Sequence, residues 1–285
     1  MEKLKIAIQK SGRLSEKSLD IIAEAGINLI NGSRKLISIA SNFPLEILYL
    51  RDDDIPQYIA DGVADAGIVG ENVLVESGAR LDIVERLGFA RCRLSLAVNK
   101  SSDYSDRSYF NGKRIATSYP ATLKRWLQEN SIDAEIHIIN GSVEIATGIG
   151  LADAIFDIVS SGSTLISNGL KEVEKVMDSE AVLLTAPDIN DARRDILDEL
   201  LFRLRAVLAS RNNKYILLNA PDDKLDKIIG AIPGMKSPTV LPLAMKGWSS
   251  VHSVVNENDF WQVIGKLREY GAQGILVIPI EKMIV

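Results

Sequence analysis

Asp153-Ala154-Ile155-Phe156-Asp157-Ile158-Val159-Ser160-Ser161-Gly162-Ser163-Thr164-Leu165 joins a β-branched strand to a turn of serine, glycine and threonine. Side chains alternate along a strand, so the carboxylates of Asp153 and Asp157 are predicted on one face. Backbone N–H groups around Gly162, with nearby hydroxyls, can form an anion nest at the start of a following helix. Such turns are also common without a ligand. If a ligand binds, the pattern favours a phosphate with hydroxyl groups beside it, such as a ribose 5-phosphate.

Strands alternate with helices through the first half of the chain. Strands are predicted at Leu4–Ile8, Ile47–Leu50 and Ala66–Val69, a helix ending at Gly26, and a short helix at Ile55–Ala60. This alternation predicts an α/β fold with a mostly parallel sheet. Ligands of such sheets collect at the carboxyl ends of the strands. The turns predicted to line one crevice are 9–14, 51–54 and 70–72.

A polar segment at Asn99–Asn111 is interpreted as a hinge to a second lobe. Gly62–Ile68 is echoed by Gly150–Phe156, 150 − 62 = 88 residues later, which suggests that both lobes repeat one βαβ plan. The resulting fold is two-lobed, like the periplasmic binding proteins. Residues 1–98 plus 181–211 are assigned to the first lobe and 99–180 to the second.

The C-terminal part reads as a separate unit. After a strongly apolar helix at Ile196–Arg211, residues 212–285 show the order β-α-β-β-α-β, which is typical of a ferredoxin-like domain. This unit contains no obvious nucleophile or base. A binding or regulatory role is therefore predicted for it.

Composition excludes several classes of protein. The 285-residue chain has a net charge of −5, which argues against a nucleic-acid partner. Cys92 is the only cysteine, and His137 and His252 stand alone, so neither a disulfide nor a zinc site is expected. No stretch approaches the roughly 20 apolar residues of a membrane span. A soluble, cytoplasmic protein with no membrane partner is expected.

A long gapped pattern begins at Glu144 and reads E-x5-G-x-A-x2-I-x-D-I-x2-S-G-x-T-L. It resembles the signature of the ATP phosphoribosyltransferases, the enzymes that open histidine biosynthesis. The resemblance extends over nearly the whole chain in the order of the family's long form. Its further motifs are Lys10–Leu14, Arg51–Pro56, Gly67–Asn72, Gly112–Pro120 and Ser237–Thr239.

The resemblance implies transfer of a phosphoribosyl group from phosphoribosyl pyrophosphate to N1 of ATP, with release of pyrophosphate. Mg²⁺ is expected mainly on substrate phosphates, and its protein ligands are not identified. The residues implied in catalysis are Lys10, Arg13, Glu71 and Asp157. Those implied for phosphoribosyl pyrophosphate are Glu144, Asp153, Asp157, Ser160, Ser161, Gly162, Ser163 and Thr164. Those implied for ATP are Gly12, Arg51, Asp54, Ser118 and Tyr119.

Structural alternatives stay open for several of these residues. Asp153 could be an ordinary strand-start residue, and Lys10 and Arg13 could be solvated surface charges. The triplet 52–54 could be a solvated turn in which Asp54 caps the next helix, and Glu71 could likewise be a helix cap.

In long-form relatives the C-terminal domain binds histidine as a feedback inhibitor. The resemblance places this site at Asn219, Thr239, Val254 and Gly274. Asn219 stands where some relatives carry an acid, so inhibition is expected to be retained but weakened, unless another carboxylate compensates. The resemblance also implies a homo-oligomer, either a dimer or a hexamer.

Two other functions compete with this interpretation. A two-lobed sensor of small molecules would share the cleft, and a phosphoribosyltransferase for another base would share the nest. Only the adenine pocket distinguishes the latter, and sequence alone does not define it.

Overall fold

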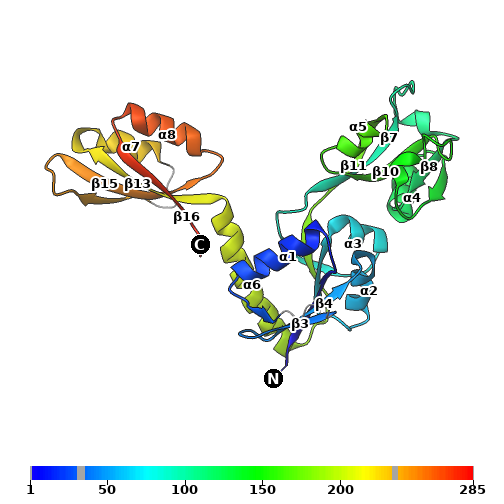
Figure 1. The fold of residues 1–285 in the computed structure, drawn as a ribbon, viewed down its shortest axis with the longest axis horizontal. Helices are drawn as coiled ribbons and strands as arrows, with labels where there is room; N and C mark the ends of the chain where they lie inside the picture. Colours follow the sequence, from blue (N-terminus) through cyan, green and yellow to red (C-terminus); the bar gives the residue numbers. More distant parts are fainter. Residues whose placement is uncertain (1, 31–35, 233–236, 285) are drawn as a thin grey trace. The chain divides into compact units, whose positions relative to one another are not determined.

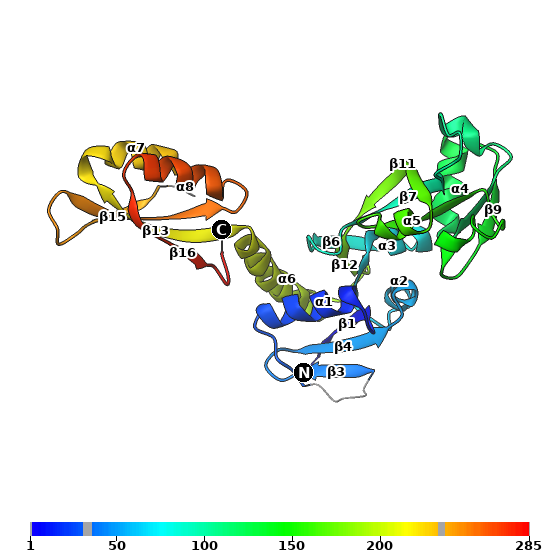
Figure 2. The same cartoon turned by 45° about the horizontal axis from the view of Figure 1, so that its top comes forward.

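A computed structural model describes residues 2–30, 36–232 and 237–284. The chain forms two compact units, one made of residues 1–23 and 27–198, the other of residues 24–26 and 199–285. The first unit contains two lobes, each built on its own sheet (Figures 1 and 2). No helix in the described ranges is both long and apolar enough to cross a membrane.

The first lobe is a seven-stranded sheet in the order β2-β3-β4-β1-β5-β12-β6. Strand β1 lies parallel between β4 and β5, as alternating strands and helices predict. The strands are β1 (Leu4–Gln9), β2 (Leu29–Ile30), β3 (Ile37–Ala40), β4 (Leu45–Leu50), β5 (Ala66–Gly70), β6 (Asp82–Arg86) and β12 (Ala181–Thr185). The helical segments are α1 (Arg13–Glu24), the 3₁₀ turn η1 (Asp52–Asp54), α2 (Ile55–Ala60) and α3 (Glu71–Ser77).

The second lobe is a five-stranded sheet in the order β11-β7-β10-β8-β9. Its strands are β7 (Cys92–Asn99), β8 (Arg114–Thr117), β9 (Glu135–Ile138), β10 (Ala154–Val159) and β11 (Leu170–Ser179). Its helical segments are η2 (Arg107–Phe110), α4 (Pro120–Glu129), η3 (Val143–Ile145) and α5 (Ser163–Ser167). Leu123 of α4 packs with Phe156, whereas Leu165 of α5 packs with Ile155, so the two helices cover opposite faces of β10.

The chain crosses between the lobes at two adjacent places. Outward it passes through residues 87–91, and it returns at Glu180; Leu87 N–H donates to Ala181 O and Ala181 N–H to Phe89 O, both at 2.9 Å. Strand β7 therefore lies in the second sheet, whereas the boundary predicted at residue 98 places it in the first lobe. The polar segment 99–111 is no crossing, because Phe110 within it is buried in the second lobe's core.

The two lobes repeat one plan, as the sequence echo suggests. Strands β4, β1, β5 and β12 of the first sheet correspond in order and direction to β9, β8, β10 and β7 of the second. Asp65 and Asp153, 88 positions apart, also make the same contacts. Asp65 Oδ2 accepts from Lys5 N–H at 2.7 Å, and Asp153 Oδ2 accepts from Arg114 N–H at 2.9 Å. The two-lobed fold of the periplasmic binding proteins is thus confirmed.

The helix α6 (Asp191–Arg211) leads into the C-terminal domain. That domain is a four-stranded antiparallel sheet in the order β14-β15-β13-β16. Its elements are β13 (Asn213–Pro221), η4 (Asp222–Lys224), α7 (Leu225–Ala231), β14 (Thr239–Pro242), β15 (Trp248–Asn256), α8 (Phe260–Glu269) and β16 (Gln273–Pro279). Helices α7 and α8 lie on the same side of this sheet (Figures 1 and 2). The predicted ferredoxin-like order is confirmed.

Candidate active site

The turns after β1, β4 and β5 lie at one edge of the first sheet, because these three strands are parallel neighbours. Lys10 follows β1 and its N–H donates to Leu50 O at 2.8 Å, which brings it beside Arg51 at the end of β4. Lys10, Arg13 and Arg51 have no ion-pair partner within the described ranges. Cations at strand ends without carboxylate partners are suited to bind phosphate groups.

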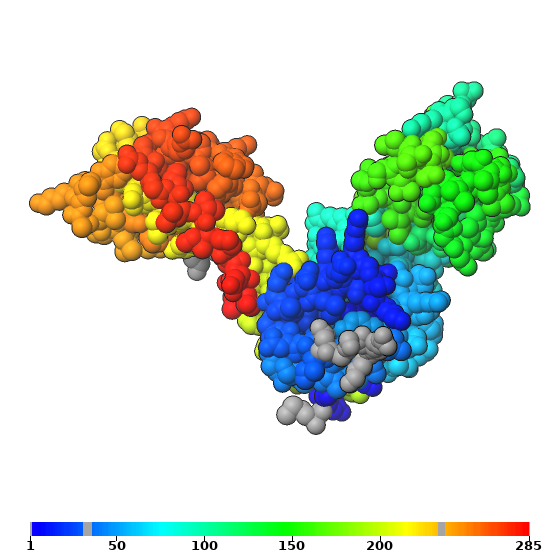
Figure 3. All heavy atoms as spheres, viewed as in Figure 1, coloured from blue at the N-terminus to red at the C-terminus, as the bar shows by residue number. Residues whose placement is uncertain are grey.

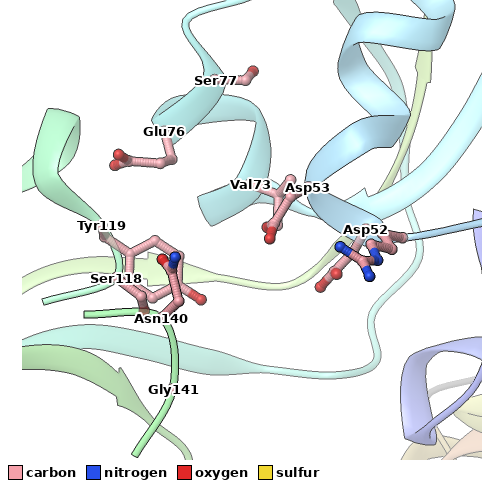
Figure 4. A pocket seen from close by; sticks show the side chains of 10 residues that line it. Asp52, Asp53, Val73, Glu76, Ser77, Ser118, Tyr119, Asn140 and Gly141 are labelled. Atoms are coloured by element: carbon pink, nitrogen blue, oxygen red, sulfur yellow. The ribbon is translucent and has the colours of Figure 1, made fainter. Parts of the chain in front are cut away.

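A cavity of about 540 Å³ lies between the strand ends of the two lobes (Figure 4). The first lobe contributes residues after β4 and from α3, and the second contributes residues after β8 and β9. They are Arg51, Asp52, Asp53, Val73, Glu76, Ser77, Ser118, Tyr119, Asn140 and Gly141. The predicted residues Arg51, Ser118 and Tyr119 are thereby brought together.

Carboxylates dominate the electrostatics of this cavity. Burial, followed by the neighbouring charges of Asp52, Asp54 and Glu76, raises the pKa of the Asp53 carboxyl. Burial, followed by the charge of Asp157 and then that of Asp52, raises the pKa of the Tyr119 hydroxyl. Tyr119 therefore keeps its proton at neutral pH and can donate a hydrogen bond to a ligand. Asn72 Nδ2 of the first lobe donates to the Tyr119 hydroxyl of the second at 3.4 Å, so the two walls face each other.

The nest predicted after β10 has the expected backbone. Gly162 has a left-handed φ of +80° directly before α5, and the Ser161 and Ser163 hydroxyl oxygens lie 2.9 Å apart. Arg93 Nη1 donates to Ser160 O at 3.0 Å and holds the start of the turn. Because Ser160, Ser161, Ser163 and Thr164 are exposed, their hydroxyls are open to a ligand.

Asp157 lies just before this nest. Its Oδ1 accepts from Ile158 N–H at 2.8 Å. Burial is the main cause that raises the pKa of the Asp157 carboxyl, and the nearby charge of Glu144 raises it further. The Glu144 charge thus acts on Asp157, and the role of these two carboxylates toward a ribose stays a prediction.

Asp153 stands apart from this pair. It precedes β10, so four strand positions, roughly 13 Å, separate it from Asp157. Its Oδ1 lies 3.1 Å from Arg114 Nη2, and hydrogen bonds from Arg114 lower the pKa of the Asp153 carboxyl. Asp153 occupies the amino end of its strand, opposite the ligand edge. This geometry favours the interpretation of Asp153 as an ordinary strand-start residue.

Of the predicted site residues, only Arg51, Ser118 and Tyr119 line the cavity, so Lys10, Arg13, the nest and Asp157 lie outside it, as do Glu71, Gly12 and Asp54. Both oxygens of Glu71 bind Arg86, at 2.6 and 2.7 Å, beside the segments that cross between the lobes. Gly12 has a φ of +97° in the turn after β1. Asp54 stands at the N-cap of α2 without a side-chain capping bond, because its own backbone is already helical after η1. The predicted Asp54 cap is wrong.

Sequence reasoning missed five lining residues, which are Val73, Glu76, Ser77, Asn140 and Gly141. The last two follow β9, which lies parallel to β8, so the rule that pointed to Arg51 also applies to them. The dipeptide Asn-Gly is moreover a turn signal. Glu76 lies within α3 and no local pattern marks it.

The donor set around the cavity suits a magnesium ion that arrives with substrate phosphates. No group of three or more His, Cys, Asp or Glu side chains in the described part of the chain could by itself hold a metal. Mg²⁺ is usually held by one or two carboxylates together with substrate phosphates. Asp52 and Asp53 line the cavity and could supply such carboxylates.

The four residues predicted to bind histidine lie on the sheet face of the C-terminal domain that α7 and α8 leave uncovered. Asn219 neighbours Ser250 on β15, and Thr239 pairs with His252, so alternation places these side chains on one face with Val254. A Cβ on Gly274 would lie 3.3 Å from Asn219 Nδ2, so the two positions touch. Figure 3 shows the last strand (red) at the surface of this domain.

Fold and cleft together define a two-lobed α/β protein of the periplasmic-binding-protein type, with an added ferredoxin-like domain. The sequence model of the family described as ATP phosphoribosyltransferase matches residues 51–206, and that described as HisG, C-terminal domain, matches residues 210–282. The chain belongs to the ATP phosphoribosyltransferase family, in its long form, and is a pentosyltransferase.

Named relatives agree along the full chain. The ATP phosphoribosyltransferase of Bacteroides thetaiotaomicron is 57% identical over 282 residues, which cover 99% of this chain and 100% of the relative. The ATP phosphoribosyltransferase of Cytophaga hutchinsonii is 59% identical over 281 residues, which cover 99% of this chain and 98% of the relative. The solved ATP phosphoribosyl transferase (HisG:HisZ) complex from Thermotoga maritima contains a chain with a TM-score of 0.64 and 29% identity, covering 72% of this chain and 98% of that one.

Proposed function

We propose that this enzyme transfers the phosphoribosyl group of phosphoribosyl pyrophosphate to N1 of ATP and releases pyrophosphate, the first step of histidine biosynthesis. The observation that carries the proposal is the set of groups at the strand ends of the two lobes. The first lobe has Lys10, Arg13 and Arg51, which have no ion-pair partner in the described ranges, and the second has the nest after β10 and the buried Asp157. Arg51 and Tyr119 line the cavity between the lobes. A cytoplasmic location follows from this biosynthetic role.

The nest at residues 160–164 binds the 5-phosphate, and Asp157 with Glu144 holds the ribose hydroxyls. Lys10 and Arg13 neutralise the pyrophosphate, whose charge grows as the bond to C1 breaks. ATP occupies the cavity beside Tyr119. Such a transfer builds positive charge on the sugar, so positioning and electrostatic stabilisation supply most of the rate. When bound on the phosphates, Mg²⁺ neutralises part of their negative charge.

Histidine binds the uncovered sheet face at Asn219, Thr239, Val254 and Gly274 and inhibits the enzyme. The same face exposes apolar side chains on its outer strands, with Leu241 at 50% and Leu276 at 56% exposure. Such residues support a homo-oligomer, a dimer or a hexamer, because a second copy can bury them. Light scattering after gel filtration measures the number of copies.

The test is a pyrophosphate-release assay with ATP, phosphoribosyl pyrophosphate and Mg²⁺, run with and without L-histidine. We expect turnover with ATP, none when ATP is omitted, little with GTP, and suppression by millimolar histidine. Turnover that histidine leaves unchanged would remove the regulatory proposal alone. Folded protein that turns over neither ATP nor another purine nucleotide would point instead to a sensor of small molecules.

A further inference from the structure

Helix α3 of the first lobe reaches across the cavity to α4 of the second. Glu76 Oε1 accepts from Ala121 N–H at 2.8 Å, and Glu76 Oε2 accepts from Thr122 N–H at 2.8 Å and from the Thr122 hydroxyl at 2.7 Å. Asn72, one helical turn earlier on the same face, donates from Nδ2 to the Tyr119 hydroxyl at 3.4 Å. Arg125 Nη2 in turn donates to Val75 O at 3.3 Å.

Helix α4 depends on this contact because its own sequence provides no cap. Tyr119 stands at the N-cap and makes no side-chain capping bond, and Pro120 has no N–H. The N–H groups of Ala121 and Thr122 lie in the first turn, where a helix offers them no internal acceptor. A carboxylate from the other lobe satisfies both and also complements the helix dipole.

The contact sets the geometry of the cavity. Glu76 belongs to one wall, whereas Ser118 and Tyr119, which directly precede α4, belong to the other. Figure 4 shows the Glu76 side chain extending from α3 toward the segment that carries Tyr119. A bond between Glu76 and the start of α4 therefore fixes the separation of the two walls.

We propose that Glu76 is a positioning residue that clasps the two lobes and sets the spacing of the cavity for its nucleotide. The clasp acts through α4 on Tyr119. That ATP occupies the cavity rests on the proposed function, whereas the clasp itself is a property of the free protein.

Hydrogen exchange at Ala121 and Thr122 tests whether the clasp forms. In Glu76→Ala we expect these two amides of the full-length, ligand-free protein to exchange about tenfold faster or more, the factor that a charge-assisted hydrogen bond represents. Glu76→Gln keeps one acceptor oxygen and should fall between. Unchanged exchange in Glu76→Ala would overturn the clasp whatever the enzyme's substrate is.

ATP affinity, measured by calorimetry with Mg²⁺, tests the positioning role. We expect the Kd for ATP to rise roughly tenfold in Glu76→Ala. Thr122→Val removes the hydroxyl that donates to Glu76 from α4, at a residue that does not line the cavity. It should raise the Kd for ATP about threefold or more. An unchanged Kd in Thr122→Val together with a raised Kd in Glu76→Ala would mean that Glu76 contacts ATP directly. That result would overturn the proposal.

Asp106→Ala is the matched control. Asp106 caps η2 by accepting from Ser108 N–H at 2.8 Å, a bond within the second lobe. Its loss should speed exchange at Ser108 and leave the Kd for ATP unchanged. An equal loss of ATP affinity in Asp106→Ala would overturn positioning in favour of general loosening. If the wild type binds no ATP, the proposed function fails, and the exchange data alone decide the clasp.

Discussion

Gly162 provides the left-handed backbone conformation of the proposed phosphate nest. Its φ of +80° favours glycine, yet a Cβ would meet only Val159 Cγ1 at 3.9 Å, so a small side chain fits. Asn and Asp tolerate this conformation best among other residues. We expect Gly162→Asp to raise the KM for phosphoribosyl pyrophosphate at least 100-fold, because the new carboxylate would lie where the 5-phosphate is proposed to bind. Gly162→Asn, the neutral isostere, should raise it far less, and steady-state kinetics compares the two.

Replacing Asp157 by asparagine is predicted to raise the stability of the protein and to lower its activity. Burial raises its pKa above the ordinary 3.8, so the charged carboxylate costs the folded state free energy at pH 7. Asp157→Asn should therefore raise the Tm by about 2–4 °C at pH 7, as about 1 kcal/mol would. Activity should fall roughly 10- to 100-fold, because a charged acceptor for the ribose is lost.

The pH dependence of that gain has a definite sign. Below the unfolded carboxyl's pKa near 3.8, both the wild type and Asp157→Asn are neutral at this position and their stabilities converge. Urea unfolding at pH 8, 6 and 4.5 should thus show a gain that shrinks as the pH falls. A gain that grows toward pH 4.5 would contradict the burial of the Asp157 charge.

At the scale of elements, an aspartate directly before β10 and another directly before β5 each accept from a backbone N–H of the parallel neighbour strand. Each also binds an arginine: Asp153 binds Arg114 of β8, and Asp65 Oδ1 lies 2.6 Å from Arg193 Nη1 of α6. Asp65 is 7% exposed, so Asp65→Asn should cost about 3 kcal/mol. Solvent screens the half-exposed pair at Asp153, and Asp153→Asn should cost about 1 kcal/mol or less.

Kinetics separates this role of Asp153 from ligand binding. We expect Asp153→Asn to keep the wild-type KM for phosphoribosyl pyrophosphate. Hydrogen bonds from Arg114 lower the Asp153 pKa, so its stabilisation is present above pH 3.8 and is lost as the pH falls through that lowered value. The stability loss should therefore shrink at acid pH. A KM raised tenfold or more would return Asp153 to the ligand site.

Features of this structure that depend on residues close in sequence could be predicted, whereas contacts between residues distant in sequence could not. Strands such as β1 and β5 and the order of the C-terminal domain follow from local patterns of apolar residues, and the positions of Arg51 and Tyr119 follow from the rule for strand ends. The clasp at Glu76 could not be predicted, because its partners Ala121 and Thr122 are brought to it only by the packing of two lobes.

At the scale of the whole molecule, catalysis and its inhibition are assigned to different compact units. Every residue proposed to touch a substrate lies in residues 10–164, and every residue proposed to bind histidine lies in residues 219–274. Substitutions in the second set should therefore change the response to histidine without changing the KM for either substrate in its absence.

Asn219→Asp is the sharpest change of this kind. A carboxylate at this position would pair with the histidine amino group, and a charge-assisted hydrogen bond contributes about 1.5–3 kcal/mol against about 1 for a neutral one. The histidine concentration for half inhibition should therefore fall roughly fivefold. Asn258→Asp makes the same chemical change at an exposed residue just after β15 and should leave that concentration unaltered. Equal shifts in both variants would trace the effect to net charge instead of to contact at Asn219.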